Sequence, residues 1–174
     1  MVKKAEITGI GAVTEVPDEE WHTVGPVEIP LLGGPPVPVI LDGYSDDEAP
    51  EDFHEAVRAF VALNRAALEA AVPAIFAYYR DVAESTDAVD VEIAGPGDVL
   101  DHITLGREPT VSRDTYTDHH VYVSLECECA WEPEHGLQLV FRDGRTVSKV
   151  GPYDGHLTNA SAYGDPSLTN VVYR

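Results

Sequence analysis

The chain is 174 residues long and strongly acidic, with a formal net charge of −20 at pH 7. This length suits a single domain over residues 1–174 whose core needs neither metals nor disulfides, because a domain of this size buries roughly two-thirds of its unfolded surface. The negative charge disfavours binding to nucleic acids or anionic lipid, and it favours cationic partners such as a basic protein or metal ions. The alternative is a solvated acidic surface that only maintains solubility.

Residues 1–13 contain two lysines but no sustained apolar run before a small-residue cleavage site, so we expect no secretory signal. No stretch approaches the ~20 apolar residues that cross a bilayer. The sequence therefore predicts a cytoplasmic protein that does not insert in a membrane.

The first part of the predicted sheet lies in residues 21–41. Short β-branched runs alternate there with Gly25-Pro26 and with the Gly-Gly-Pro-Pro run at 33–36. Proline cannot donate a hydrogen bond to a neighbouring strand, so this pattern favours a hairpin of short edge strands.

A long helical pattern follows, beginning near Pro50 with Glu51 and Asp52 placed to interact with the positive end of a helix dipole. Its apolar residues recur at steps of three and four and define one stripe: Phe53, Val57, Phe60, Val61, Leu68, Ala71, Val72, Ile75, Phe76 and Tyr79. Pro73 interrupts the pattern, which predicts either a kink over residues 69–72 or a second helix that begins at Pro73. His54 is predicted to lie at the surface or at its boundary.

Residues 121–156 predict a three-stranded antiparallel meander. Every second residue from Val121 to Trp131 is apolar, while Glu126 and Glu128 fall between them, as in a half-buried strand. Asp143-Gly144 suits the type I′ turn of a hairpin. The fold class we predict is α+β, with an antiparallel sheet built from the N-terminal hairpin and the C-terminal meander and packed against one kinked helix or a helix pair.

Cys127 and Cys129 are interpreted as two buried thiols, because one intervening residue on one strand would strain a disulfide. A nucleophilic cysteine activated by His119, His120 or His135 is disfavoured. The adjacent Glu126 and Glu128 raise a thiol pKa rather than lower it.

The turn from Glu132 to Gly136 gathers two carboxylates and an imidazole. Asp154 and His156 join them if the second loop of the meander lies at the same end of the sheet. Such a set offers ligands that zinc, manganese or iron accept, but its spacing matches no established metal motif. The simpler interpretation is a solvated turn with no metal, and we expect no cofactor.

An acidic surface is the third candidate site. Its carboxylates are Asp18, Glu19, Asp46, Asp47, Glu48, Glu51, Asp52, Glu126, Glu128, Glu132 and Glu134. Carboxylates on such a face speed the encounter with a basic partner. Trp21, Tyr122 and Tyr153 are either aromatic anchors for that partner or parts of the core.

The residues Cys129, Trp131, Glu134, His135 and Gly136 form a Cys-x-Trp-x-x-Glu-His-Gly segment. This segment resembles the signature of an uncharacterised family of small bacterial domains, and the similarity extends over about residues 17–174. The resemblance implies no activity and no catalytic residue. It implies an association of some members with immunity to secreted toxins.

Together these observations favour a non-enzymatic acidic binding protein, of the kind that inhibits a basic toxin. The candidate partner-binding residues are Glu126, Glu128, Glu132, Glu134, His135, Tyr153, Asp154 and His156. The alternative function is a metal-binding protein or metal-dependent hydrolase that uses Glu132, Glu134, His135, Asp154 and His156.

Overall fold

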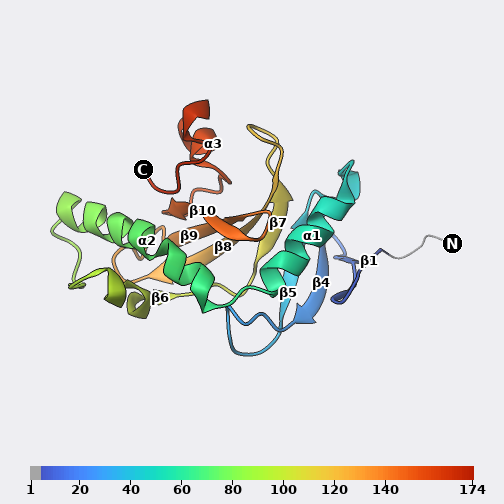
Figure 1. Cartoon of the computed structure of the whole chain (residues 1–174), viewed down its shortest axis with the longest axis horizontal. Coiled ribbons are helices and arrows are strands. Elements are labelled where there is room, and N and C mark those ends of the chain that lie inside the picture. The colour runs from blue at the N-terminus through green and yellow to red at the C-terminus, as the bar shows by residue number, and fades with distance from the viewer. Residues whose placement is uncertain (1–4) are drawn as a thin grey trace.

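A large sheet organises the computed structural model, which describes residues 5–174 (Figure 1). Its main strands run in the order β10-β9-β8-β7-β5-β4-β3, and β6 pairs with β8 beyond this path. Their bounds are β3 Thr14–Glu15, β4 Trp21–Val27, β5 Val37–Asp42, β6 Ile103–Thr104, β7 Thr110–Arg113, β8 Val121–Cys129, β9 Leu137–Arg142 and β10 Thr146–Gly151. A separate small hairpin joins β1 (Glu6–Ile7) to β2 (Gly11–Ala12). The predicted α+β class is confirmed.

The N-terminal hairpin and the C-terminal meander meet at the pair β5–β7. This pair is parallel, with Ile40 opposite Thr110 and Leu41 opposite Val111. The other pairs in this sheet are antiparallel, as predicted. Parallel neighbours need a long crossover connection, and residues 43–109 provide it with both long helices.

The two long helices are α1 (Pro50–Val61) and α2 (Arg65–Ser85), which meet at 92°. The alternative of a helix pair is therefore correct, but the predicted break at Pro73 is wrong. Pro73 lies inside α2, and the break falls just before Asn64, whose side chain accepts a hydrogen bond from the Ala66 N–H at 2.9 Å. This N-cap starts α2, and burial of apolar side chains on both sides of Pro73 offsets the lost hydrogen bond.

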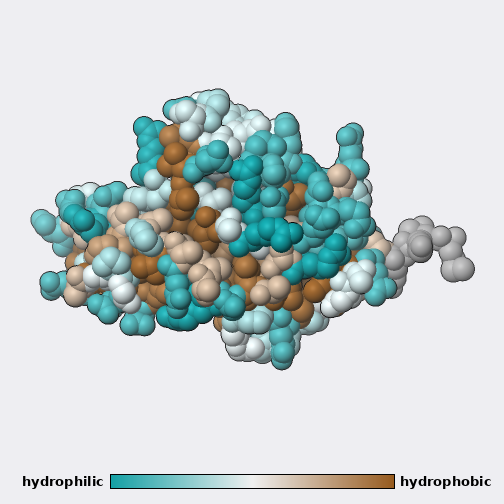
Figure 2. Space-filling view, viewed as in Figure 1, coloured by the Kyte–Doolittle hydropathy of each residue, from teal (hydrophilic) through white to brown (hydrophobic). Residues whose placement is uncertain are grey.

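Both helices pack on the same face of the sheet and form the core with it. The alternate residues of β8, from Val121 to Cys129, are buried there together with Leu137, Leu139 and Phe141 of β9. The rings of Phe60 and Phe141 lie 5.1 Å apart, so α1 rests directly on β9. On this side hydrophilic residues cover α1, whereas α2 exposes a mixture of polar and apolar residues (Figure 2). Among the described helices, none alone is long and apolar enough to cross a membrane, although the bent pair reaches that length and composition.

His54 is buried, so its predicted position at the surface or its boundary is wrong. Its Nε2 lies 2.7 Å from the Tyr44 hydroxyl, and only 7% of the residue is exposed. The chain before α1 folds back over the start of the helix and covers His54. The helical pattern alone placed this residue at the edge of the apolar stripe.

The chain ends with two short helical segments, α3 (Asn159–Tyr163) and η3 (Pro166–Leu168). The Val150 N–H of β10 donates to the Val172 carbonyl at 2.7 Å, and Asn159 Nδ2 donates to the Val171 carbonyl at 2.7 Å. The C-terminal residues therefore cover the outer edge of β10 and satisfy one of its backbone groups.

Candidate functional site: an acidic groove on the sheet

A groove crosses the face of the sheet that points away from the core. Its floor consists of side chains that alternate with core residues, including Thr110 and Ser112 of β7 and Ser124 and Glu126 of β8. Thr110 lies opposite both Ile40 of β5 and Ser124 of β8, so three strands contribute to one row. The central hollow has a volume of about 520 Å³.

The loop from Leu105 to Glu108 forms one wall. Gly106 approaches β8 so closely that a Cβ atom built on it would lie 1.8 Å from the Glu126 carbonyl oxygen. Arg107 donates from Nη1 to the Gly33 carbonyl at 3.0 Å and from Nη2 to the Pro35 carbonyl. These bonds tie the wall to the β4–β5 loop. They also occupy Arg107, which among residues 5–174 is the one lysine or arginine that lines the groove.

The segment from Tyr153 to Leu157 forms the opposite wall, and a buried lysine holds it. Lys149 is 1% exposed, and its Nζ donates to Gln138 Oε1 at 2.7 Å and to Asp154 Oδ1 at 2.8 Å. Gln138 Nε2 in turn donates to Ser124 Oγ at 3.0 Å and to the His156 carbonyl at 3.1 Å. This network binds the wall to the floor through β9 and β10.

Burial lowers the pKa of Lys149, and the ion pair with Asp154 opposes that shift only in part. The carboxylate of Asp154 therefore favours the charged form of Lys149 inside the protein. A buried cation of this kind is tolerated when its donors are satisfied by a carboxylate and an amide oxygen.

Two further hollows extend the groove at its ends. One, of about 480 Å³, lies beside Asp18, Glu19 and Glu20 and shares Ile40, Asp42 and Thr110 with the central hollow. The other, of about 430 Å³, lies beside the turn from Glu132 to Gly136 and shares Glu126, Cys127 and Glu128 with it. We call the three connected hollows the acidic groove.

Nine carboxylates line the acidic groove. They are Asp18, Glu19, Glu20, Asp42, Glu108, Glu126, Glu128, Glu132 and Glu134. Within residues 5–174, none of them forms a salt bridge with a lysine or an arginine. By contrast, two acidic residues outside the groove, Asp47 and Asp52, pair with Arg113 at 2.7 and 2.8 Å. Within residues 5–174, the nine carboxylates of the groove therefore have no lysine or arginine partner.

The structure places Glu126 and Glu128 on the open face, exposed, while Cys127 and Cys129 point into the core. Burial raises the pKa of Cys127 to about 12 and that of Cys129 to about 11. Neither thiol has the accessible, acidic character of a nucleophile. Of the three aromatic candidates, Tyr122 is fully buried, whereas Trp21 and Tyr153 border the groove.

The turn after β8 is organised by Glu132. Its Oε1 accepts the N–H groups of Glu134 at 3.1 Å and His135 at 3.3 Å, and its Oε2 lies 3.5 Å from His135 Nδ1. Partial burial raises the pKa of Glu132, but these N–H groups and the imidazole outweigh it and hold that pKa below its usual value. One potential ligand atom from each of Glu132, Glu134 and His135 lies within 4.8 Å of the others.

Asp154 and His156 do not join this cluster. The Tyr153 N–H donates to the His135 carbonyl at 3.1 Å, so the two loops do lie at the same end of the sheet. However, the Asp154 carboxylate pairs with Lys149, and His156 Nδ1 lies 2.7 Å from Ser161 Oγ. The structure therefore brings together three of the five residues of the alternative metal set and gives the other two different partners.

Comparison with known proteins identifies one family. The chain matches a domain of unknown function (DUF6985) over residues 10–157. It belongs to this family. The DUF6985 region includes every residue of the acidic groove and both of its walls, while α3 and η3 lie beyond it. No curated protein and no solved structure matches the chain.

Several residues of the site escaped prediction from the sequence, notably Gly106, Arg107, Gln138 and Lys149. Gly106 and Arg107 lie in the connection between β6 and β7. Lys149 offers the clearest signal, because a lysine two residues after Val147 and directly before Val150 in a predicted strand indicates either an edge position or a buried ion pair.

Proposed function

We propose that this chain is a non-enzymatic binding protein whose acidic groove receives a basic segment of a protein partner, as an immunity-type inhibitor of a basic toxin would. The observation that carries the proposal is the set of nine groove carboxylates that no lysine or arginine of residues 5–174 neutralises. Like charges gathered in one hollow repel one another, and a cationic ligand relieves that repulsion.

The shape of the site also supports binding to an extended segment. The groove runs across β5, β7 and β8 from the loop before β4 to the turn after β8, and it is open along its length. Hydroxyl groups of Thr110, Ser112 and Ser124 line its floor and can accept or donate hydrogen bonds to such a segment. The net charge of −20 adds long-range attraction that accelerates association with a basic partner.

Neutralising the groove tests this proposal. In Glu126→Gln/Glu128→Gln, we expect a short synthetic peptide of alternating arginine and lysine to bind roughly fivefold to thirtyfold more weakly. This range follows from a loss of roughly 0.5–1 kcal/mol of binding free energy for each of the two exposed charges. Isothermal titration calorimetry at about 0.02 and about 0.15 M salt measures the affinities, and the difference shrinks at the higher salt because screening weakens the interaction.

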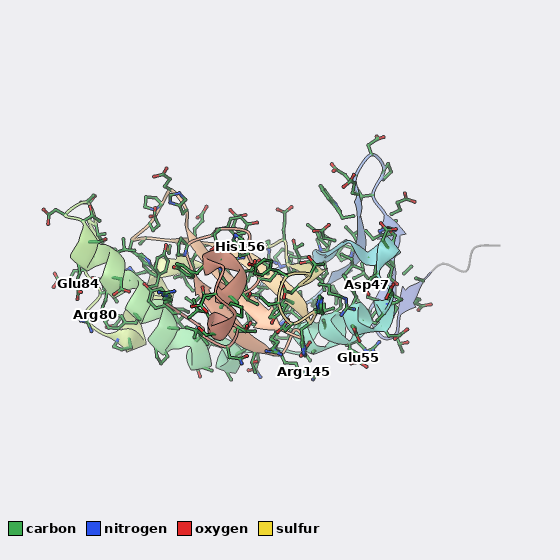
Figure 3. All side chains as sticks on the ribbon, turned by 90° about the horizontal axis from the view of Figure 1, so that it is seen from above. Asp47, Glu55, Arg80, Glu84, Arg145 and His156 are labelled. Carbon is green, nitrogen blue, oxygen red and sulfur yellow. The ribbon has the colours of Figure 1, made fainter. Side chains whose placement is uncertain are left out.

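The matched control is Glu69→Gln/Glu84→Gln, which removes the same charge from α2. Both of its residues are exposed, and Glu84 lies far from the wall that contains His156 (Figure 3). We expect this control to bind almost as tightly as the unaltered chain. Equal weakening in both variants would show that only net charge attracts the peptide, and no binding by the unaltered chain would reject the proposal.

A second function, metal binding at the turn after β8, is supported by the convergence of Glu132, Glu134 and His135 within 4.8 Å. For a metal site at this turn we expect one Zn²⁺ or Mn²⁺ ion to bind per chain. We expect His135→Ala to abolish this binding while the protein still folds. Calorimetric titration with each metal measures the stoichiometry. His156→Ala, which alters a histidine outside the cluster, retains the ion, and equal loss in both variants would contradict a site at this turn.

A further inference from the structure

We infer that the acidic groove selects arginine over lysine, because Tyr153 presents an exposed aromatic side chain in the same hollow as Glu126 and Glu128. This inference rests on the proposed function and specifies the chemistry of the basic segment. It assigns Tyr153 the role of a specificity-determining residue for a guanidinium group.

Backbone contacts hold the segment that carries Tyr153 against the sheet. It lines the same central hollow as Glu126 and Glu128. Its own N–H donates to the His135 carbonyl at 3.1 Å, and the His156 carbonyl accepts a hydrogen bond from Gln138, the residue opposite Glu126 in the β8–β9 register. The ring therefore belongs to a wall anchored over the strand that neighbours the glutamates.

The ring of Tyr153 is available to a ligand. The residue is 41% exposed, and in the part of the chain that the structure describes its hydroxyl makes no hydrogen bond and no cation lies over its ring. Five other tyrosines use their hydroxyls within the fold: Tyr44, Tyr78, Tyr79, Tyr122 and Tyr173. The exposed Tyr163 carries the Arg174 guanidinium 4.9 Å above its ring, which is the contact that we propose for Tyr153 with a ligand.

A guanidinium group fits these surroundings better than an ammonium group. Glu126 and Glu128 are two residues apart on one strand, so their backbone positions lie roughly 6.8 Å from each other. A guanidinium has five N–H donors in a planar fork, so it can donate to both carboxylates while its flat face stacks on the Tyr153 ring. An ammonium group is a compact and strongly hydrated charge that gains less from a planar surface.

Peptides of equal charge test the inference. We expect hexa-arginine to bind roughly threefold to tenfold more tightly than hexa-lysine in calorimetric titrations at low salt. Tyr153→Leu keeps an apolar side chain and the backbone N–H but removes the aromatic face, so hexa-arginine affinity falls to that of hexa-lysine while hexa-lysine affinity stays unchanged. Thermal unfolding followed by circular dichroism confirms that the variant folds.

Tyr116→Leu is the matched control. Tyr116 is 61% exposed, lies in the loop between β7 and β8 and does not line the groove, so its replacement should leave both affinities unchanged. Equal affinity for both peptides in the unaltered chain would overturn the selectivity and leave the proposed function standing. An equal loss of affinity for both peptides in Tyr153→Leu would also overturn the selectivity, because the ring would then contribute to the shape of the groove without distinguishing a guanidinium from an ammonium group. Binding of neither peptide would reject the proposed function together with this inference.

Discussion

Asp154→Ala is expected to lower the free energy of unfolding by roughly 2–3 kcal/mol, whereas Lys149→Met lowers it less. The first substitution leaves the ammonium of Lys149, which is 1% exposed, with Gln138 Oε1 as its only acceptor among residues 5–174. This loss of unfolding free energy is smaller than the loss expected on breaking a fully buried ion pair, because the Asp154 side chain is 36% exposed. The second substitution removes the buried charge and leaves Asp154 hydrated.

The order of these two effects is the informative result, and urea denaturation at pH 7 measures it. In the double variant Lys149→Met/Asp154→Ala we expect little further loss beyond that of Lys149→Met, since Asp154 then has no buried charge to neutralise and its remaining hydrogen bond, from the His156 N–H at 2.9 Å, is exposed. A larger loss of unfolding free energy in Lys149→Met than in Asp154→Ala would contradict this prediction. It would mean that the interactions of the Lys149 ammonium stabilise the fold by more than the free energy that its burial costs.

The same pair gives a pH dependence whose sign follows from the lowered pKa of Lys149. Because the pKa in the folded chain lies below its ordinary value of about 10.5, the unfolded chain binds more protons between these two pKa values. Stability attributable to Lys149 therefore rises with pH through that window. Asp154→Ala removes the carboxylate that raises the pKa of Lys149, so in this variant the rise in stability begins at lower pH. The stability deficit of Asp154→Ala relative to the unaltered chain should therefore shrink as the pH increases. Lys149→Met, which lacks the titrating amine, should show no such recovery.

Gly106→Ala should destabilise the fold by roughly 3 kcal/mol and weaken binding of a basic peptide to the groove. Its Cβ would lie 1.8 Å from the Glu126 carbonyl oxygen and 3.0 Å from the Glu126 carbonyl carbon. Both atoms belong to the backbone of β8, so no side-chain rotation relieves the overlap. The wall from Leu105 to Glu108 must then move away from the strand and reshape the central hollow.

Gly97→Ala is the control for this substitution. Within residues 5–174, a Cβ added at Gly97 would meet no heavy atom within 4 Å apart from those of its own residue and its two chain neighbours, and its backbone does not need a positive φ. We expect its free energy of unfolding to change by no more than about 1 kcal/mol in urea denaturation, and its peptide affinity to stay the same. A Gly106→Ala chain as stable as Gly97→Ala, with unchanged peptide binding, would contradict the close packing of this wall on β8.

The strand that carries Glu126 and Glu128 could be predicted from the sequence, and the turn at Asp143-Gly144 as well. Both residues of that turn have positive φ, of 51° and 68°, as a type I′ hairpin requires. These features depend on a few neighbouring residues, because strand alternation and turn geometry are properties of the local backbone. The helix boundary was predicted less well, since capping by Asn64 and packing against the sheet outweighed the expected effect of Pro73.

The acidic charge, the α+β class, and the outward glutamates with inward thiols were thus determined by the sequence itself, through composition and short-range periodicity. The tertiary structure alone decided that Asp42, Glu108 and Glu126 share one hollow and that Lys149 pairs with Asp154 beneath its wall. The physical reason is that the parallel pairing of β5 with β7 joins segments separated by the whole helical crossover, and no local pattern specifies which distant strand becomes a neighbour.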